Sequence, residues 1–241
     1  MPKTDPAREA LLTALEASGV SIPLWDGILI EETVRVAPGA TILPGCILRG
    51  NTTIAAGSVI GPDSVLTDAV IGKNCTVKNT YITESTLEEN VSIGPFSQVR
   101  PGCHIAAGCK IGDFVEVKNS HIGQKTAIAH LTYVGDTDCG SGVNFGCGVA
   151  IANFNGKEKF RTTIGDNAFL GCNTNLVAPV TIGAGAYTAA GATVTRDVPE
   201  DAMLIARAEQ TVDEPRGQTG QNQFIIVFFE LNTTLHTSYF S

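Results

Sequence analysis

Aromatic residues are scarce in this chain of 241 residues, of which they make up 6 %, with a single Trp. A globular core of this size normally uses more Phe, Tyr and Trp, whereas the narrow interior of a solenoid is filled by Ile, Val, Leu and small residues. Positive charge is also in short supply, because 16 Lys and Arg stand against 24 Asp and Glu, and the formal net charge is −8. This balance argues against general nucleic-acid binding, which needs a basic surface.

Long apolar runs and metal-type cysteine spacings are missing as well. The opening MPKTDPAREA lacks the apolar stretch of a secretory signal, and no run approaches the length of a membrane span. We therefore expect a cytoplasmic protein that makes no membrane contact. The seven cysteines include no CxxC pair, which argues against a structural zinc site. Four of them recur at one position of a repeat and are predicted to fill the core as free thiols; they are Cys46, Cys75, Cys103 and Cys109.

What the chain does contain is an apolar residue at every sixth position from about residue 36 to about residue 194. The pattern begins at Val36 and Ile42 and returns at Ile93 and Ile182. A period of six matches neither the helix nor the strand, so each hexad is a unit with one short strand and one Gly-rich corner. Three such sides close a triangular coil, and stacked coils form a parallel β-helix. We count about 27 hexads, which predicts about nine coils.

A short helix is predicted outside the repeat, over residues 5–19. Asp5 can serve as its N-cap, Pro6 suits the first helical position, and Gly19 can end it. Past Arg207 the hexads stop and a polar segment follows, with the apolar run FIIVFFEL near the end, for which we have no functional interpretation. The predicted parts are an N-terminal helix and lead-in (1–35), a β-helix domain (36–207) and a C-terminal tail (208–241).

One large interruption breaks the period. After Ile151 the next hexad begins only at Ile164, so the segment ANFNGKEKFRTT carries about seven extra residues. Insertions in solenoids become loops on one face, often the binding face. Three basic residues against one acidic residue give this loop a local excess of +2 on an acidic protein, which favours an anionic ligand over a merely solvated loop. The charged residues are Lys157, Glu158, Lys159 and Arg161.

Residues three hexads apart lie above one another, about 4.8 Å apart, which turns spacing into geometry. Arg100 and Lys118 are both second residues of hexads and are predicted to stack. Two cations at this distance repel by about 1 kcal/mol in water. A bound phosphate would turn this repulsion into attraction. The alternative is that both side chains splay into solvent.

His130 begins a second ladder, because the residues stacked above it are all small. Such an edge, about 14 Å long, suits a thin ligand like the pantetheine arm of coenzyme A, whose thioester would end near the imidazole. Glu116, stacked under Tyr133, is predicted to orient His130 as a general base. The alternative is an ordinary surface histidine. The small residues of the ladder are Cys147, Cys172 and Ala190.

The remaining histidines give no such signal. His104 and His121 follow no partner pattern, and their hexad positions differ from one another and from that of His130. A metal centre of three imidazoles is therefore not predicted.

The stretch from Ile93 to Arg207 contains, in order, IGPFSQVRPG, IGDFVEVKNS, AHLTYVGD, VNFGCG, ANFNGKEKF and LVAPVTIGAGAYTAAGATVTRDVP. It resembles the C-terminal acetyltransferase domain of the bifunctional bacterial N-acetylglucosamine-1-phosphate uridyltransferase/glucosamine-1-phosphate acetyltransferase, of the hexapeptide-repeat acyltransferase superfamily. Residues 5–92 match more loosely. The resemblance implies an all-β, left-handed parallel β-helix that forms a homotrimer with active sites between subunits. It also implies acetyl-CoA as cosubstrate and no metal for acetyl transfer.

The resemblance also implies a role for each matching residue. His130 would be the catalytic base, with Glu116 behind it. The sugar phosphate would be held by Arg100, Lys118, Tyr133, Asn144 and Lys159. The acetyl-CoA site would be lined by Cys147, Asn153, Phe154, Cys172, Ala190 and Arg207.

This chain departs from the family pattern at three positions of the acetyl-CoA site. The family has Tyr where Phe154 stands, Ser where Cys172 stands and Ala where Cys147 stands. These changes remove a hydroxyl or add bulk beside the coenzyme and leave the proposed base untouched. No Gly-rich nucleotide loop of the uridyltransferase type occurs, so we expect acetyl transfer alone, with the uridyl step left to a separate nucleotidyltransferase.

The predicted activity is N-acetylation of glucosamine-1-phosphate for the synthesis of UDP-N-acetylglucosamine and cell-wall precursors. Two alternatives remain open. One is an acetyltransferase acting on another amino sugar or nucleotide sugar. The other is a non-catalytic β-helix that binds sugar phosphates and regulates a nucleotidyltransferase. A purely structural solenoid is disfavoured by the basic insertion.

Overall fold

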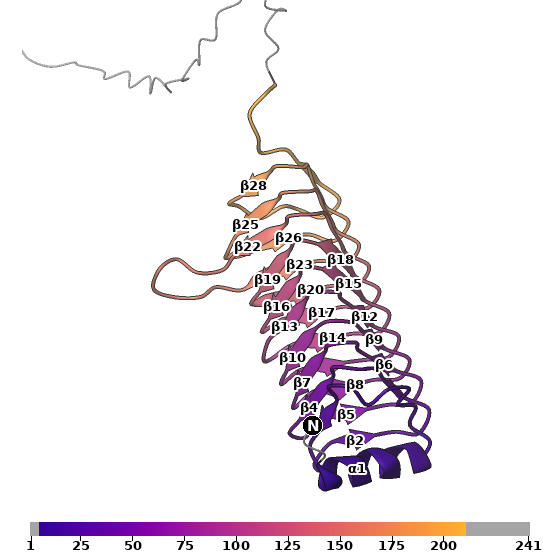
Figure 1. Ribbon diagram of the computed structural model, residues 1–241. Coiled ribbons are helices and arrows are strands. Elements are labelled where there is room, and N and C mark those ends of the chain that lie inside the picture. The colour runs from indigo at the N-terminus through magenta and orange to yellow at the C-terminus, as the bar shows by residue number, and fades with distance from the viewer. Residues whose placement is uncertain (1–4, 211–241) are drawn as a thin grey trace, which may run out of the picture. The chain divides into compact units, whose positions relative to one another are not determined.

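The computed structural model describes residues 5–210, in which a helix is followed by a parallel β-helix (Figure 1). All strand pairs within the three sheets are parallel, and each strand pairs with the strand one coil later. The predicted parallel β-helix is therefore confirmed, while its left-handedness remains a prediction. Two faces have ten strands and one has nine, slightly more than the coils predicted, because strands at Leu29 and Met203 extend the stack at both ends.

The three faces follow one another along the chain. Face 1 consists of β1 (Leu29–Ile30), β4 (Ile47–Arg49), β7 (Val65–Thr67), β10 (Tyr81–Thr83), β13 (Gln98–Val99), β16 (Glu116–Lys118), β19 (Tyr133–Gly135), β22 (Ala150–Ala152), β25 (Asn175–Val177) and β28 (Thr193–Val194). Face 2 consists of β2 (Arg35–Val36), β5 (Thr53–Ile54), β8 (Val70–Ile71), β11 (Thr86–Leu87), β14 (His104–Ile105), β17 (His121–Ile122), β20 (Thr137–Cys139), β23 (Thr162–Ile164) and β26 (Val180–Ile182). Face 3 consists of β3 (Thr41–Ile42), β6 (Val59–Ile60), β9 (Thr76–Val77), β12 (Ser92–Ile93), β15 (Lys110–Asp113), β18 (Ala127–His130), β21 (Asn144–Phe145), β24 (Phe169–Leu170), β27 (Tyr187–Thr188) and β29 (Met203–Leu204).

The core is a continuous column of mostly aliphatic side chains, to which most strands contribute one buried residue. Ile60, Leu66 and Ile128 are fully buried, and Phe145 is the one buried aromatic residue among residues 5–210. The scarcity of aromatic residues follows from this narrow interior, into which each face contributes only one or two side chains per coil. The four cysteines predicted to fill the core are all buried, and burial raises the pKa of each thiol.

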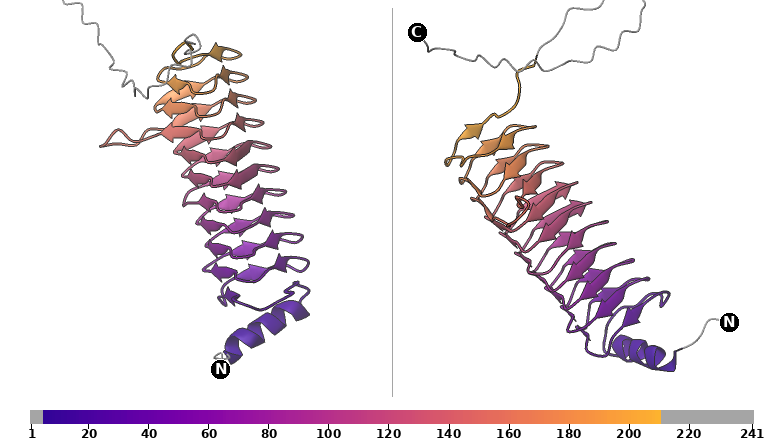
Figure 2. Two further views of the ribbon diagram at one scale, coloured as in Figure 1. Left: turned by 45° about the horizontal axis from the view of Figure 1, so that its top comes forward. Right: turned by 90° about the vertical axis from the view of Figure 1, so that its left-hand side faces the viewer.

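Helix α1 (Pro6–Ala17) covers the first coil of the solenoid (Figures 1 and 2). As predicted, Asp5 is its N-cap: the carboxylate accepts hydrogen bonds from the N–H groups of Ala7 (3.1 Å) and Arg8 (3.4 Å). Leu12 is buried against the β-helix, so the helix closes an end of the apolar column that would otherwise face water. No helix of the described residues is long and apolar enough to span a bilayer.

The predicted insertion is confirmed by the strand register. Ile122 pairs with Cys139, 17 residues later, whereas Cys139 pairs with Ile164, 25 residues later. The extra residues form a hairpin, residues 153–161, that projects from the β-helix between β22 and β23 (Figure 2, left). The Phe160 N–H donates to the Asn153 carbonyl at 2.9 Å and closes its base. The apolar run at 224–231 lies outside the described residues.

Candidate active site

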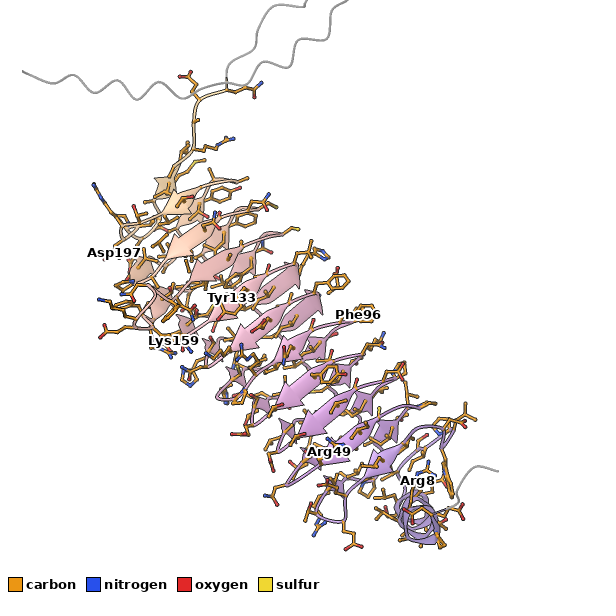
Figure 3. All side chains as sticks on the ribbon, turned by 60° about the vertical axis from the view of Figure 1, so that its left-hand side comes forward. Arg8, Arg49, Phe96, Tyr133, Lys159 and Asp197 are labelled. Carbon is orange, nitrogen blue, oxygen red and sulfur yellow. The ribbon has the colours of Figure 1, made fainter. Side chains whose placement is uncertain are left out.

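Three cations gather where face 1 meets the hairpin. Strands β13 and β16 pair Val99 with Val117, so Arg100 and Lys118 lie one above the other as predicted. Lys159 reaches the same place from the hairpin and is the main cause of a lowered pKa at Lys118, with Arg100 acting in the same direction. Tyr133 and Lys159 are labelled at the same level of the solenoid in Figure 3. We call Arg100, Lys118 and Lys159 the basic cluster.

The carboxylate beside His130 is Asp113 rather than Glu116, so the predicted Glu116–His130 contact is wrong. Asp113 and His130 are in register on β15 and β18, and His130 Nδ1 lies 2.5 Å from Asp113 Oδ1. This hydrogen bond lowers the pKa of Asp113. Glu116 does lie beneath Tyr133, as the spacing predicted, but its carboxylate accepts a hydrogen bond from Arg100 at 2.8 Å.

Asp113 and Glu116 lie on opposite sides of the corner between faces 3 and 1, which explains why Asp113 and not Glu116 contacts His130. His130 ends a strand of face 3, and the carboxylate one coil below it in the same ladder is that of Asp113. Glu116 belongs to face 1, where the nearest opposite charge is the guanidinium of Arg100, whose pKa the carboxylate raises.

A buried carboxylate that the sequence analysis did not single out lies behind the basic cluster. Asp136 is 5 % exposed and accepts hydrogen bonds from the side-chain amides of Asn119 (2.5 Å) and Asn153. Asn153 Nδ2 also lies 3.4 Å from the Tyr133 hydroxyl. Asp136 therefore links the base of the hairpin to face 1. In the sequence Asp136 was only an acidic residue at a corner of the repeat; the structure gives it a φ of +51°, a conformation that Asp adopts readily, so its presence there needed no other explanation.

The space over Gly135 is occupied by the same network. A Cβ at Gly135 would collide with the Tyr133 hydroxyl and come within 2.7 Å of Asn153 Nδ2. We expect Gly135→Ala to displace both side chains and to raise the KM for the sugar phosphate that the family resemblance predicts as substrate by about tenfold or more. Steady-state kinetics measure this, with circular dichroism to show that the protein folds. An unchanged KM would mean that neither side chain contributes to substrate binding.

An ion pair that the sequence analysis did not predict holds the C-terminal end of the hairpin. Arg161 donates to both oxygens of Asp138, through Nε to Oδ2 (2.9 Å) and Nη2 to Oδ1 (2.6 Å). His121 Nδ1 lies 3.0 Å from Oδ1 of the same carboxylate. Arg161, with a smaller contribution from His121, lowers the pKa of Asp138 from its usual 3.8 to about 2. The bidentate pair ties the hairpin to β20 in the coil below.

Arg161→Gln should loosen the hairpin without unfolding the β-helix. The ion pair is partly exposed, so we expect a loss of about 1 kcal/mol or less and a two- to fivefold rise in the KM for a sugar phosphate. Amide hydrogen exchange at Phe160 should become faster, while exchange in the core strands stays the same. Because the pKa of Asp138 is lowered by folding, this stabilisation is present above about pH 4 and is lost as the pH falls toward 2. Unaltered exchange at Phe160 would contradict the anchoring role.

The small-residue edge above His130 has the predicted register. Backbone hydrogen bonds join each coil of this edge to the next. The N–H groups of Gly148, Asn173 and Gly191 donate to the carbonyls of His130 (3.2 Å), Cys147 (2.7 Å) and Cys172 (2.8 Å), respectively. Cys172 and Ala190 are exposed along this edge, and Cys147 is half-buried. Beside His130, face 3 carries a hollow of about 290 Å³ lined by Ser92, Gly94, Lys110, Ile111, Gly112, Ala127 and Ala129.

Some predicted site residues lie away from the basic cluster. Asn144 is on face 3, in register with Ala127 and Phe169. Phe154 projects from the hairpin with 57 % of its surface exposed, and Arg207 is exposed beyond the last strand. Within one chain the structure therefore brings together only part of the predicted site.

The prediction that His104 and His121 occupy different positions in the repeat is wrong. They are in register on β14 and β17, with ring centroids 6.5 Å apart. Each has its own carboxylate: Glu88 at 2.8 Å from His104, and Asp138 beside His121. Among the described residues, no group of three or more His, Cys, Asp or Glu side chains is arranged to hold a metal ion.

Comparison with known proteins agrees with this architecture. Residues 84–119 and 161–196 match the model of the bacterial transferase hexapeptide (six repeats). The bifunctional protein GlmU of Clostridium acetobutylicum is 48 % identical over 189 residues, which cover 78 % of this chain and 41 % of that protein. GlmU of Acetivibrio thermocellus is 46 % identical over 207 residues, covering 86 % of this chain and 45 % of the relative.

This chain thus spans less than half of the length of the relatives that it matches. The solved structure of the Francisella novicida UDP-N-acetylglucosamine acyltransferase is weakly similar, at 22 % identity and a TM-score of 0.46, covering 74 % of this chain and 65 % of that one. The sequence relationship is the stronger finding: the chain carries hexapeptide repeats of the bacterial transferase type at residues 84–119 and 161–196 and is similar over most of its length to one part of the bifunctional GlmU proteins.

Proposed function

We propose that this chain transfers the acetyl group of acetyl-CoA to the amino group of glucosamine-1-phosphate, which yields N-acetylglucosamine-1-phosphate for UDP-N-acetylglucosamine synthesis. One observation carries the proposal. The His130–Asp113 pair lies at the corner where face 3 passes into face 1, the basic cluster lies at the other end of the face 1 strands beside the hairpin, and the small-residue edge starts at His130. A base with a groove for a thin ligand and an anion site thus lie at the two ends of the same short face 1 strands, which carry Tyr133. The homology to GlmU proteins supports this reading.

His130 would act as the general base. Because the Asp113 carboxylate can only accept, Nδ1 carries the hydrogen of their bond, and Nε2 is left to take a proton. The amine attacks the thioester carbonyl, so a C–N bond forms and the C–S bond breaks. The proton lost by the amine passes to His130 and then to the departing sulfur of coenzyme A. No covalent acyl-enzyme is needed, so Cys147 and Cys172 are not nucleophiles in this mechanism.

The phosphate would bind at the basic cluster. Arg100 is already held by Glu116, which fixes its guanidinium before substrate arrives, and Lys159 is held in place by the anchored hairpin. Phosphate oxygens would relieve the mutual repulsion that lowers the pKa of Lys118. Tyr133, oriented by Asn153, would contact the sugar.

Acetyl-CoA would lie along the small-residue edge, with its thioester at His130. In the part of the chain that the structure describes, the Cys147 N–H donates to no other group, so it is free to stabilise the oxyanion of the tetrahedral intermediate. Holding the amine and the thioester together at this corner would supply the proximity contribution. The other lining residues proposed are Asn153, Phe154, Cys172, Ala190 and Arg207.

The proposed assembly is a homotrimer with sites between subunits. Asn144 lies on face 3 while Lys118 and Tyr133 lie on face 1, so one chain presents the predicted sugar-phosphate residues on two different faces. A second copy whose face 3 approaches face 1 of this chain would complete the site. Sedimentation or light scattering should report three chains per particle, and an active monomer would contradict this assembly.

The direct test is an acetylation assay. The purified chain is mixed with acetyl-CoA and glucosamine-1-phosphate, and N-acetylglucosamine-1-phosphate is detected by mass spectrometry. Glucosamine, galactosamine-1-phosphate and UDP-glucosamine serve as alternative acceptors. We expect glucosamine-1-phosphate to react with the highest kcat/KM. A higher kcat/KM with another acceptor would show that glucosamine-1-phosphate is not the preferred substrate. Thermal stabilisation of the protein by sugar phosphates without turnover would indicate a non-catalytic binder.

A further inference from the structure

Two of the seven cysteines differ from the rest in their surroundings. Cys46, Cys75, Cys103, Cys109 and Cys139 are buried, whereas Cys147 is half-buried and Cys172 is exposed. Burial raises the pKa of the five core thiols, that of Cys139 to about 12, and keeps them from reacting at neutral pH. Only Cys147 and Cys172 are therefore accessible to a solute oxidant within the described residues.

These two thiols occupy the same position in successive coils. Strands β21 and β24 pair Phe145 with Leu170, which places Cys147 opposite Cys172 two residues later. The hydrogen bonds Gly146 N–H to Leu170 O and Asn173 N–H to Cys147 O, both 2.7 Å, hold the two coils together on either side of the pair. Neighbouring strands lie about 4.8 Å apart, within the range of about 4.4 to 6.8 Å between the Cα atoms of a disulfide.

The backbones also approach closely at this corner. A Cβ built on Gly146 would lie 2.5 Å from the Cys172 nitrogen, so only glycine fits there. No side chain of residue 146 can therefore separate the two cysteines. The corner is exposed, which leaves room for the small rotation about Cα–Cβ that brings one sulfur onto the other.

We propose that Cys147 and Cys172 form a modification site, at which a peroxide oxidises the pair to a reversible intrachain disulfide. The exposed Cys172 sulfur attacks the peroxide, an S–O bond forms, the O–O bond breaks, and one water leaves after protonation. The Cys147 sulfur then displaces the hydroxyl of the sulfenic acid as a second water, and the S–S bond forms. Two electrons leave the two sulfurs and reduce hydrogen peroxide to water. A dithiol reduces the disulfide back to two thiols by exchange and is itself oxidised to a disulfide.

The consequence rests on the proposed function. The disulfide would lie across the edge on which the pantetheine arm is proposed to lie, one coil above His130, and far from the basic cluster along face 1. Oxidation is therefore expected to weaken acetyl-CoA binding and to leave sugar-phosphate binding as it was.

Thiol counting tests the disulfide without reference to activity. The folded protein is treated with hydrogen peroxide, denatured and alkylated with iodoacetamide, and its mass is measured by mass spectrometry. We expect alkylated thiols to fall from seven to five, dithiothreitol to restore seven, and tryptic peptides containing Cys147 and Cys172 to be found cross-linked. The Cys172→Ser and Cys147→Ala variants should each yield no intrachain cross-link. A Cys172 sulfinic acid without cross-link, or a bond between two chains on a non-reducing gel, would overturn the proposal.

Kinetics test the regulatory consequence. The oxidised protein should show a KM for acetyl-CoA raised by at least about fivefold, reversed by dithiothreitol and absent from peroxide-treated Cys172→Ser. The KM for glucosamine-1-phosphate should stay the same. If oxidised and reduced proteins share one KM for acetyl-CoA, the disulfide does not regulate the site. If no acetyl transfer occurs in either state, the proposed function is wrong, and the thiol count still decides whether the disulfide forms.

Discussion

Replacing His130 with Ala is expected to lower acetyl-transfer turnover by about 10²-fold or more. The loss follows from geometry, because His130 is the ionisable side chain at the junction of the hollow on face 3, the small-residue edge and the corner leading to Tyr133. Its imidazole is exposed, with 57 % of the side chain accessible, so the substitution removes few packing contacts and the β-helix should stay folded. Turnover at saturating substrates, measured beside circular dichroism, separates loss of chemistry from loss of fold.

Two matched variants make this result specific. His104→Ala removes another imidazole with a carboxylate partner, Glu88, but on face 2, and turnover should stay within about twofold of the parent. Asp113→Asn keeps the shape of the partner but removes the charge that holds Nδ1–H, and we expect a loss of about tenfold, with an altered pH–rate profile. A His130→Ala protein with near-native turnover would exclude this residue as the base. Equal losses in His104→Ala would indicate a general effect on folding.

Lys159→Ala is expected to raise the KM for glucosamine-1-phosphate by about 10- to 100-fold. A hydrogen bond to a charged group is worth about 1.5–3 kcal/mol, and 1.4 kcal/mol corresponds to a factor of ten. Lys159 is the member of the basic cluster that the hairpin carries, and its proximity is the largest cause of the lowered pKa of Lys118. The KM for acetyl-CoA should change less, because the small-residue edge starts at His130, at the opposite end of the face 1 strands from Lys159.

Lys157 provides the control within the same hairpin. It is an exposed lysine two residues away whose backbone N–H is held by Asn155, and Lys157→Ala removes the same charge from the same loop. If the phosphate binds at the basic cluster, Lys157→Ala should leave the KM within about twofold. Glucosamine, which has no phosphate, should be insensitive to both variants. Equal effects of the two lysines would mean that the hairpin acts only through its overall charge.

The strand register was predictable because a β-helix repeats one local rule. The hexad period placed Arg100 under Lys118, Glu116 under Tyr133 and Cys147 over His130, and all three stackings are present. The insertion was equally predictable, because the number of residues between two successive hexad starts directly gives its length. Counting residues sufficed where neighbours are set by backbone hydrogen bonds alone.

Side-chain partners were less predictable, because counting gives the position of a backbone and not the direction in which a side chain turns at a corner. Glu116 was expected to support His130, yet it turns to Arg100, and Asp113 takes its place. Asp136 was overlooked because an Asp at a corner with positive φ is common for conformational reasons. The hairpin anchor of Arg161 on Asp138 joins residues of different coils through an insertion that has no period of its own.

The sequence by itself determined the parallel β-helix, the site of the hairpin and the ladders that carry the base and the cations, because each depends on a period of six and on backbone pairing. It also determined the capping helix, which Asp5 and Pro6 mark locally. Only the tertiary structure decided which carboxylate meets which cation or imidazole, how both ends of the hairpin are fastened, and that Asn144 and Lys118 lie on different faces. These depend on the direction in which each side chain turns at a corner and on contacts of the hairpin, which has no period of its own.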